Sequence, residues 1–133
     1  MAVLTKKQEK LFEKLFYDEA KLQRIVSELH AARVSDAKNS ADPTAKETIA
    51  RLENVVSVMG YDDPAAWLEV AGENWGKYRH TLVGKAMARR YKRREIWTRT
   101  CIMENISDGL YFKLRKEFLI SAALVAAKKN LEF

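Results

Sequence analysis

Residues 96–119 read IWTRTCIMENISDGLYFKLRKEFL, and their apolar pattern predicts two helices separated by a short polar turn. Ser107 stands where its hydroxyl can accept a hydrogen bond from a free N–H group of the second helix, which we expect to begin at Asp108. Ile106 lies in the turn, and we expect its side chain to be buried and to hold the two helices together. A short helix, a tight turn and an N-capped second helix are typical of a helix-turn-helix.

The second predicted helix has one apolar face and one polar face. Apolar residues at spacings of three and four predict a buried face made of Tyr111, Leu114, Phe118 and Ala122. The opposite face is expected to be exposed and contains Asp108, Gly109, Phe112, Lys113 and Lys116. A recognition helix presents its first two turns to the major groove, so we expect Gly109 and Lys113 nearest the base edges. Arg115 and Lys116 are expected at phosphates or at the rim of the groove.

Positive charge is concentrated in the second half of the chain. Residues 77–133 contain 14 Lys and Arg against 5 Asp and Glu, whereas residues 1–76 contain 10 against 13. Such asymmetry favours a polyanion-binding C-terminal half, although solvated surface charge is an alternative interpretation. The candidate DNA-binding residues are therefore Arg89, Arg90, Lys92, Arg93, Arg94, Arg99, Ser107, Asp108, Gly109, Phe112, Lys113, Arg115 and Lys116.

The whole chain is expected to be all-α, because strand patterns are nearly absent and helix-forming residues dominate. We expect an N-terminal amphipathic helix within residues 1–33, a linker over 34–42, and a helical domain over 43–133 whose helix-turn-helix occupies about 86–127. Within that domain the helices are expected from Pro43 to Gly60, from Pro64 to about Lys92, over 95–103, and from Asp108 to about Lys129. The glycines at positions 72, 76 and 84 are candidates to break the second of these helices once, and we expect the break between Gly72 and Gly76.

The N-terminal helix has an apolar stripe, formed by Leu4, Leu11, Leu15, Leu22, Ile25 and Leu29 and widened by Phe12, Phe16 and Val26. A widened stripe means that the helix packs on another surface. That surface is either the rest of this chain or a second copy, which would make a homodimer through this helix.

Several function classes are disfavoured. Cys101 is the single cysteine, and His30 and His80 are the only histidines, so neither a disulfide nor a metal site is expected. The sequence lacks glycine-rich phosphate loops and nucleophile motifs, so we expect neither an enzyme nor a cofactor. No apolar run reaches the roughly 18–20 residues of a membrane span, and no signal peptide is evident. We therefore expect a cytoplasmic protein that does not enter a membrane.

The segments 86–91, 106–119 and 122–123, with 42–49 upstream, resemble the ArpU/RinA-type regulators of phage late transcription. The resemblance covers about residues 42–127. It implies a helix-turn-helix similar to region 4 of sigma factors and activation of phage late genes from a promoter-proximal site. It further implies double-stranded DNA as the ligand, host RNA polymerase as a candidate partner, and the bacterial host cytoplasm as the location.

Three other interpretations stay open from the sequence. An ordinary three-helix bundle produces similar helical patterns without binding DNA. A small terminase-like packaging protein uses a helix-turn-helix within an oligomeric ring. A helical adaptor would bind only protein. The mass in solution and the salt dependence of DNA binding distinguish these possibilities from a DNA-binding regulator.

Overall fold

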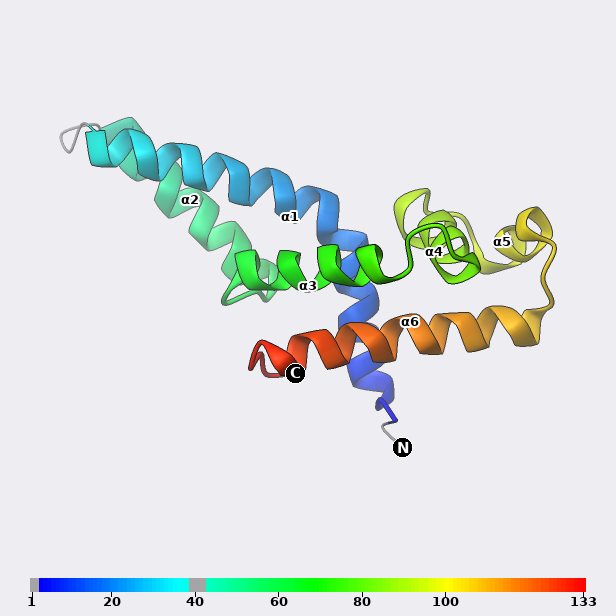
Figure 1. Cartoon of the computed structure of the whole chain (residues 1–133). Helices are drawn as coiled ribbons and strands as arrows, with labels where there is room; N and C mark the ends of the chain where they lie inside the picture. Colours follow the sequence, from blue (N-terminus) through cyan, green and yellow to red (C-terminus); the bar gives the residue numbers. More distant parts are fainter. Residues whose placement is uncertain (1–2, 39–42) are drawn as a thin grey trace. The chain divides into compact units, whose positions relative to one another are not determined.

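The computed structural model describes residues 3–38 and 43–133, and over these residues the chain is all-helical, as predicted (Figure 1). The elements in chain order are α1 (Lys6–Lys38), α2 (Pro43–Met59), α3 (Pro64–Lys77), α4 (Leu82–Met87), the π-helix η1 (Ala88–Lys92), α5 (Trp97–Glu104) and α6 (Asp108–Lys128). No strand occurs in the described part of the chain.

The chain divides into two compact units, and this division differs from the predicted domains. Unit 1 comprises residues 1–18 and 69–133, and unit 2 comprises residues 19–68. The helix α1 continues to Lys38, so residues 34–38 of the predicted linker are helical, while residues 39–42 lie outside the described part. The helix extends over residues 34–38 because small polar residues at the end of a long helix are compatible with helix when earlier turns are firmly held.

The first turn of α1 has side-chain caps at its start. The backbone N–H of Gln8 donates to the Thr5 hydroxyl at 3.1 Å, and the Thr5 N–H donates to the Gln8 side chain at 3.0 Å. This reciprocal pair is a capping box, which satisfies donors that a helix start leaves free. Further along, the predicted stripe is buried in both units, at Phe12, Leu15 and Phe16 in unit 1 and at Leu22, Ile25 and Leu29 in unit 2.

Unit 2 contains α2 and the turn that leads into α3. Gly60 ends α2 as predicted, with a φ of 93° that suits glycine. The Tyr61 N–H then donates to the Val56 carbonyl at 3.1 Å, and the Tyr61 side chain is buried. Asp63 accepts from the Ala66 N–H at 3.2 Å and so starts α3, in agreement with the predicted Asp-Pro start signal.

The predicted break between Gly72 and Gly76 does not occur. α3 continues through both glycines and ends at Lys77, and the interruption comes at residues 78–81. At this turn the Thr81 hydroxyl accepts from the Gly84 N–H at 3.1 Å and starts α4. Gly84 is needed here, because a Cβ on it would lie 2.2 Å from the Tyr78 carbonyl oxygen. The helix α3 therefore ends because the turn over residues 78–81 packs closely on α4. The low helix propensity of glycine is not the cause.

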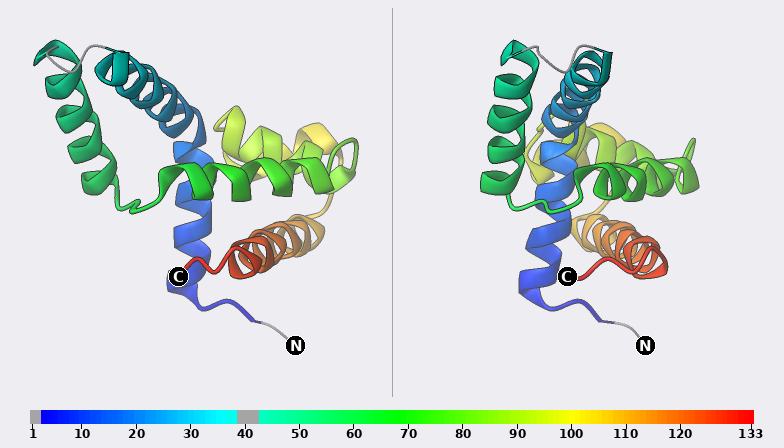
Figure 2. Two further views of the ribbon diagram at one scale, coloured as in Figure 1. Left: turned by 60° about the vertical axis from the view of Figure 1, so that its left-hand side comes forward. Right: turned by 90° about the vertical axis from the view of Figure 1, so that its left-hand side faces the viewer.

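The core of unit 1 is built around Phe118 of α6. Its ring lies 4.6 Å from that of Phe16, 4.7 Å from Trp75 and 5.6 Å from Tyr78, between ring centroids. The side-chain amide of Asn74, which is fully buried, donates to the Phe118 carbonyl at 3.1 Å. These contacts place the part of α3 in unit 1 beside α6, as Figures 1 and 2 show.

Gly72 and Gly84 should differ in their effect on the free energy of unfolding when they are replaced by alanine. A Cβ on Gly72 would meet nothing within 4 Å, whereas one on Gly84 would collide with the Tyr78 backbone. Gly72→Ala is expected to raise the free energy of unfolding by about 0.5–1 kcal/mol through helix propensity. Gly84→Ala is expected to lower it by about 1–3 kcal/mol through overpacking. Urea unfolding monitored by tryptophan fluorescence measures both, and equal effects of the two variants would contradict this assignment.

Candidate nucleic-acid interface

The candidate interface is built on the junction between α5 and α6. Asn105 ends α5 in the left-handed conformation, with a φ of 54°. The Ile106 N–H donates to the Cys101 carbonyl at 3.0 Å and the Asn105 N–H to the Ile102 carbonyl at 3.3 Å, which is the pattern of a Schellman motif. Ser107 then accepts from the Leu110 N–H at 3.1 Å and caps α6, as predicted. Residues 105–107 therefore connect the two helices, and hydrogen bonds hold both the end of α5 and the start of α6.

The two predicted faces of α6 are present. Tyr111, Leu114, Phe118 and Ala122 are all buried. On the opposite side lies a set of exposed residues that we name the outer face of α6, made of Gly109, Phe112, Lys113 and Lys116. A Cβ on Gly109 would meet nothing within 4 Å, so the backbone at the start of this face is open to approach.

Aromatic rings fix the position of Phe112 on this face. The Trp97 ring at the start of α5 lies 5.2 Å from that of Phe112 and 6.0 Å from that of Tyr111. Phe112 nevertheless keeps 46% of its surface exposed. The Tyr111 ring also lies 5.2 Å from that of Phe112, and an exposed ring held by two neighbours offers an apolar contact at little cost in side-chain entropy.

Ile106 is less buried than predicted. It is half-exposed in the turn, whereas Thr100 and Cys101 of α5 are buried at the joint between the helices. The apolar residues Ile102 and Met103, next in the chain, are 77% and 48% exposed. The sequence pattern did not show this arrangement, because in a helix of only eight residues several choices of inward face fit equally well. Burial raises the pKa of the Cys101 thiol, and Asp108 adds to the shift, so the thiol is held in its protonated form.

Arg89 and Arg90 were predicted to contact DNA, and the structure assigns both to internal interactions. The Arg89 guanidinium, largely buried, forms ion pairs with Glu95 at 3.2 Å and with Glu104. Arg90 donates to the Glu95 carbonyl at 3.0 Å and lies over the Tyr17 ring. These contacts leave less of either guanidinium for an external anion. No local sequence pattern indicated them, because the carboxylates that pair with Arg89 lie 6 and 15 residues further along the chain and approach it only after folding.

The remaining cations of the basic run are exposed but differ in their contacts. The Arg94 guanidinium donates to the Tyr17 carbonyl at 3.0 Å, and the Lys92 ammonium lies 4.4 Å from the Trp75 ring centroid. Arg93 forms no ion pair or side-chain hydrogen bond with any described residue. Arg99 on α5 keeps 64% of its side chain exposed, with Glu95 at 3.8 Å. Of this run, Arg93 is thus the cation most available to an external anion.

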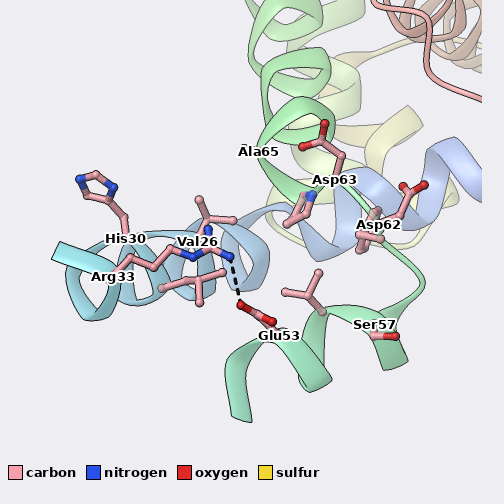
Figure 3. Close-up of a pocket in the computed structure, with 12 residues that line it drawn as sticks. Val26, His30, Arg33, Glu53, Ser57, Asp62, Asp63 and Ala65 are labelled. Atoms are coloured by element: carbon pink, nitrogen blue, oxygen red, sulfur yellow. Dashed lines mark hydrogen bonds and ion pairs between the residues drawn. The ribbon is translucent and has the colours of Figure 1, made fainter. Parts of the chain in front are cut away.

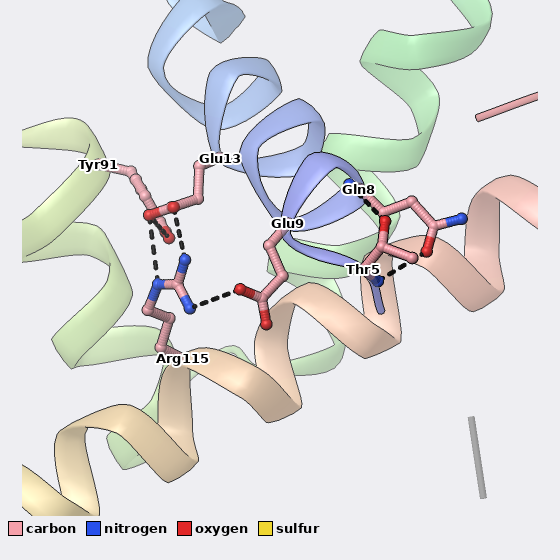
Figure 4. A network of polar contacts seen from close by, with 6 residues as sticks. All are labelled: Thr5, Gln8, Glu9, Glu13, Tyr91 and Arg115. Atoms are coloured by element: carbon pink, nitrogen blue, oxygen red, sulfur yellow. Dashed lines mark hydrogen bonds and ion pairs between the residues drawn. The ribbon is translucent and has the colours of Figure 1, made fainter. Parts of the chain in front are cut away.

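Arg115, which was predicted at a phosphate or at the rim of the groove, is also held in internal ion pairs. Its guanidinium donates to Glu13 at 2.6 Å and pairs with Glu9 at 3.5 Å, and both carboxylates belong to α1 (Figure 4). The Tyr91 hydroxyl donates to the second Glu13 oxygen at 2.9 Å. This network joins α1, η1 and α6 inside unit 1. The signal that could have revealed it is the spacing of Glu9 and Glu13, two acids on successive turns of an otherwise apolar helix face.

Unit 2 contains a hollow of about 650 Å³ between α1 and α2 (Figure 3). Its polar lining mixes both signs, because His30 and Arg33 face it together with Glu53, Asp62 and Asp63. Arg33 and Glu53 already pair across it at 3.3 Å. This hollow therefore lacks the single sign of charge that a polyanion requires.

The described residues offer neither a metal site nor a membrane-spanning helix. No group of three or more His, Cys, Asp or Glu among them is arranged to hold a metal ion. No helix among residues 3–38 and 43–133 is both long and apolar enough to cross a membrane. Comparison with protein-family models, with curated proteins and with solved structures gave no match for this chain.

The network around Arg115 should contribute to stability. Glu13→Gln leaves the largely buried Arg115 guanidinium without its main counter-charge and is expected to lower the free energy of unfolding by about 1–3 kcal/mol. Arg115→Met and the double variant complete a mutant cycle. In that cycle the losses should be clearly non-additive. Glu117→Gln, an exposed change on the same helix, is the matched control and should alter stability by less than about 0.5 kcal/mol. Additive losses would show that Glu13 and Arg115 act independently.

Tyr91 gives the network a pH dependence. Burial of the phenol, with the Glu13 carboxylate beside it, raises its pKa far above the ordinary value of 10.0. Because the folded-state pKa is higher than the unfolded one, the stabilisation is complete below about pH 10 and declines as the pH rises further. Urea unfolding at pH 8 and at pH 10.8 should show a smaller alkaline loss for Tyr91→Phe than for the wild-type protein. An identical alkaline loss would show that other groups cause it.

Proposed function

We propose that unit 1 binds double-stranded DNA and that the outer face of α6 enters the major groove. The observation that supports this most is the exposed face itself, where Phe112, Lys113 and Lys116 follow the open backbone at Gly109 on the same side of the helix. The ammonium groups of Lys113 and Lys116 form no ion pair with any described residue. Two free cations beside a rigid aromatic ring and an open helix start provide donors for bases and phosphates together.

The charge balance of unit 1 supports the same proposal. This unit contains 18 Lys and Arg against 10 Asp and Glu, so it is strongly basic even after its internal ion pairs are formed. Lys113 is proposed to donate to base edges, because it follows Gly109 by one helical turn on the same face. Lys116, Arg93 and Arg99 are proposed to contact phosphates at the sides of the groove. The Ser107 cap and Asp108 fix and orient the start of α6.

A role in regulating transcription follows from sequence-specific binding and from the resemblance to the ArpU/RinA-type regulators. Activation of phage late genes, with host RNA polymerase as a partner, belongs to that same proposal. A homodimer through α1 would need residues other than the main stripe, because Phe12, Leu15 and Leu22 are buried. A small terminase-like ring would have a mass of about eight or more copies, so sedimentation equilibrium distinguishes it from a monomer or dimer.

A protein-binding adaptor is the second candidate, and one observation favours it. Ile102, Met103 and Phe112 are exposed near the junction of α5 and α6, and apolar groups on a surface are typical of protein interfaces. An adaptor of this kind would not need the free cations of α6. Binding to duplex DNA and its salt dependence therefore separate the two candidates.

Lys113 tests the proposed base contact. After selection of a preferred duplex from a random pool, Lys113→Ala is expected to cost about 1–3 kcal/mol on that duplex and much less on random DNA. The matched control is Lys128→Ala, which removes the same charge from an exposed site at the other end of α6. It should weaken binding to the preferred duplex and to random DNA only slightly and by the same factor. Fluorescence anisotropy measures all four affinities. Equal losses on specific and random DNA for Lys113→Ala would exclude base reading by this residue.

Gly109→Glu tests entry of α6 into the groove without removing a contact. The new carboxylate has open space and lies in the first helical turn, where the helix dipole favours negative charge, so the protein should stay folded. Repulsion from phosphates should then abolish binding. A folded Gly109→Glu protein with wild-type affinity would show that this helix stays outside the groove.

A further inference from the structure

A hollow of about 420 Å³ lies in unit 1 between the end of α3 and the α4–η1 segment. Every charged group that lines it is basic, namely Arg79, Lys85 and Lys92, with His80 beside them. No carboxylate is among its lining residues. We name this site the basic hollow. Its residues are separate from those of the outer face of α6.

The cations of the basic hollow are not neutralised by the protein. Arg79 and Lys85 are exposed, and neither forms an ion pair with any described residue. Lys92 contacts the face of the Trp75 ring, a neutral partner that leaves its charge uncompensated. Glu73, the chain neighbour of Gly72, pairs instead with Lys129 at 2.9 Å. The hollow therefore has a one-signed positive potential, unlike the mixed hollow of unit 2.

The walls of the basic hollow are firmly held. The turn that contains Arg79 and His80 is fixed on α4 by the Tyr78 carbonyl, which accepts from the Thr81 hydroxyl at 2.7 Å. On the other side, Gly72 and Gly76 expose helix backbone, and a Cβ on either would meet nothing within 4 Å. A held backbone that carries several cations beside open helix backbone can accept an extended anion without a change in the fold, with only the exposed side chains to order.

We propose that the basic hollow binds the sugar–phosphate backbone of duplex DNA, as a second contact in addition to α6. The inference rests on the proposed function and deepens it. Phosphates fit better than an acidic peptide, because a peptide would also need an apolar anchor and the Trp75 ring is already in contact with Lys92. Without a side chain placed to read base edges, the contact is independent of DNA sequence.

Paired removal of charge tests the proposal. The double variant Arg79→Ala/Lys85→Ala should weaken binding to preferred and random duplexes by the same factor. The slope of log K against log salt should become shallower by about 1.8, or about 0.9 for each lost phosphate contact. Lys128→Ala combined with Lys10→Ala removes two exposed charges outside the hollow and is the matched control. An unchanged salt slope in the hollow variant, with the wild-type protein binding normally, would overturn the proposal.

A neutral obstruction tests the same site without changing charge. Gly72→Gln extends a polar side chain from the wall of the hollow, and the open space at this position allows the protein to fold. DNA affinity should fall although the melting temperature does not, whereas Ser27→Gln, at an exposed position of α1, should leave affinity unchanged. Wild-type affinity in a folded Gly72→Gln protein would contradict binding in the hollow.

The outcomes separate this inference from the proposed function. If the Lys113 and Gly109 variants lose DNA affinity and the hollow variants do not, α6 is the interface and the basic hollow is not part of it. Absence of any duplex binding by the wild-type protein rejects both. A polyglutamate peptide serves as the acidic-peptide probe. If it binds the wild-type protein and loses affinity in the hollow variants while DNA affinity is unchanged, the hollow is a peptide site and the proposal fails.

Discussion

The ion pair between Glu13 and Arg115 is the contact on which the arrangement of unit 1 depends. It joins the first turns of α1 to α6 at 2.6 Å, and the Tyr91 hydroxyl adds η1 through the same carboxylate. One acid thus ties together three elements that are up to 102 residues apart in the chain. Phe118 and the rings around it supply apolar contact in the same unit, whereas the network, like the Asn74 hydrogen bond to the Phe118 carbonyl, adds the directional geometry that favours one orientation.

Internal pairing, in this network and elsewhere in unit 1, limits which cations are available for binding. Of the basic residues in the second half of the chain, Arg89 and Arg115 are occupied by carboxylates, and Arg90 by a backbone carbonyl. Partly buried arginines of this kind are poor phosphate ligands, because releasing them would leave an unpaired carboxylate behind. The free cations are mostly lysines on exposed helix faces, together with Arg79 and Arg93. The net charge of a segment therefore overstates the charge that a ligand can meet.

The sequence was informative where local chemistry determines structure. The helical class and the starts of α2, α3 and α6 were predicted correctly, because Asp-Pro and Ser-Asp are strong local start signals. The burial of Tyr111, Leu114, Phe118 and Ala122 was also predicted, since a long helix has an unambiguous apolar face. The predictions failed where residues distant in the sequence determine the local structure. No local pattern contains the contacts that pair Arg115 with Glu13, end α3 at Lys77 and leave Ile106 half-exposed. The role in binding DNA stays a prediction.

The glycines show how the fold's own requirements can be separated from those of a ligand. Gly60 has a positive φ, and Gly84 lies against a carbonyl oxygen, so the fold accounts for both. Gly72, Gly76 and Gly109 are in helices, where glycine costs about 1 kcal/mol relative to alanine, and a Cβ on any of them would meet nothing within 4 Å. Folding gains nothing from glycine at these three positions. Each lies where the helix backbone is open, on the outer face of α6 or in the basic hollow, with free cations on the same surface. The proposed approach of a DNA backbone to these helices would supply a physical reason for glycine, because a side chain at these positions would stand between the helix and the phosphates.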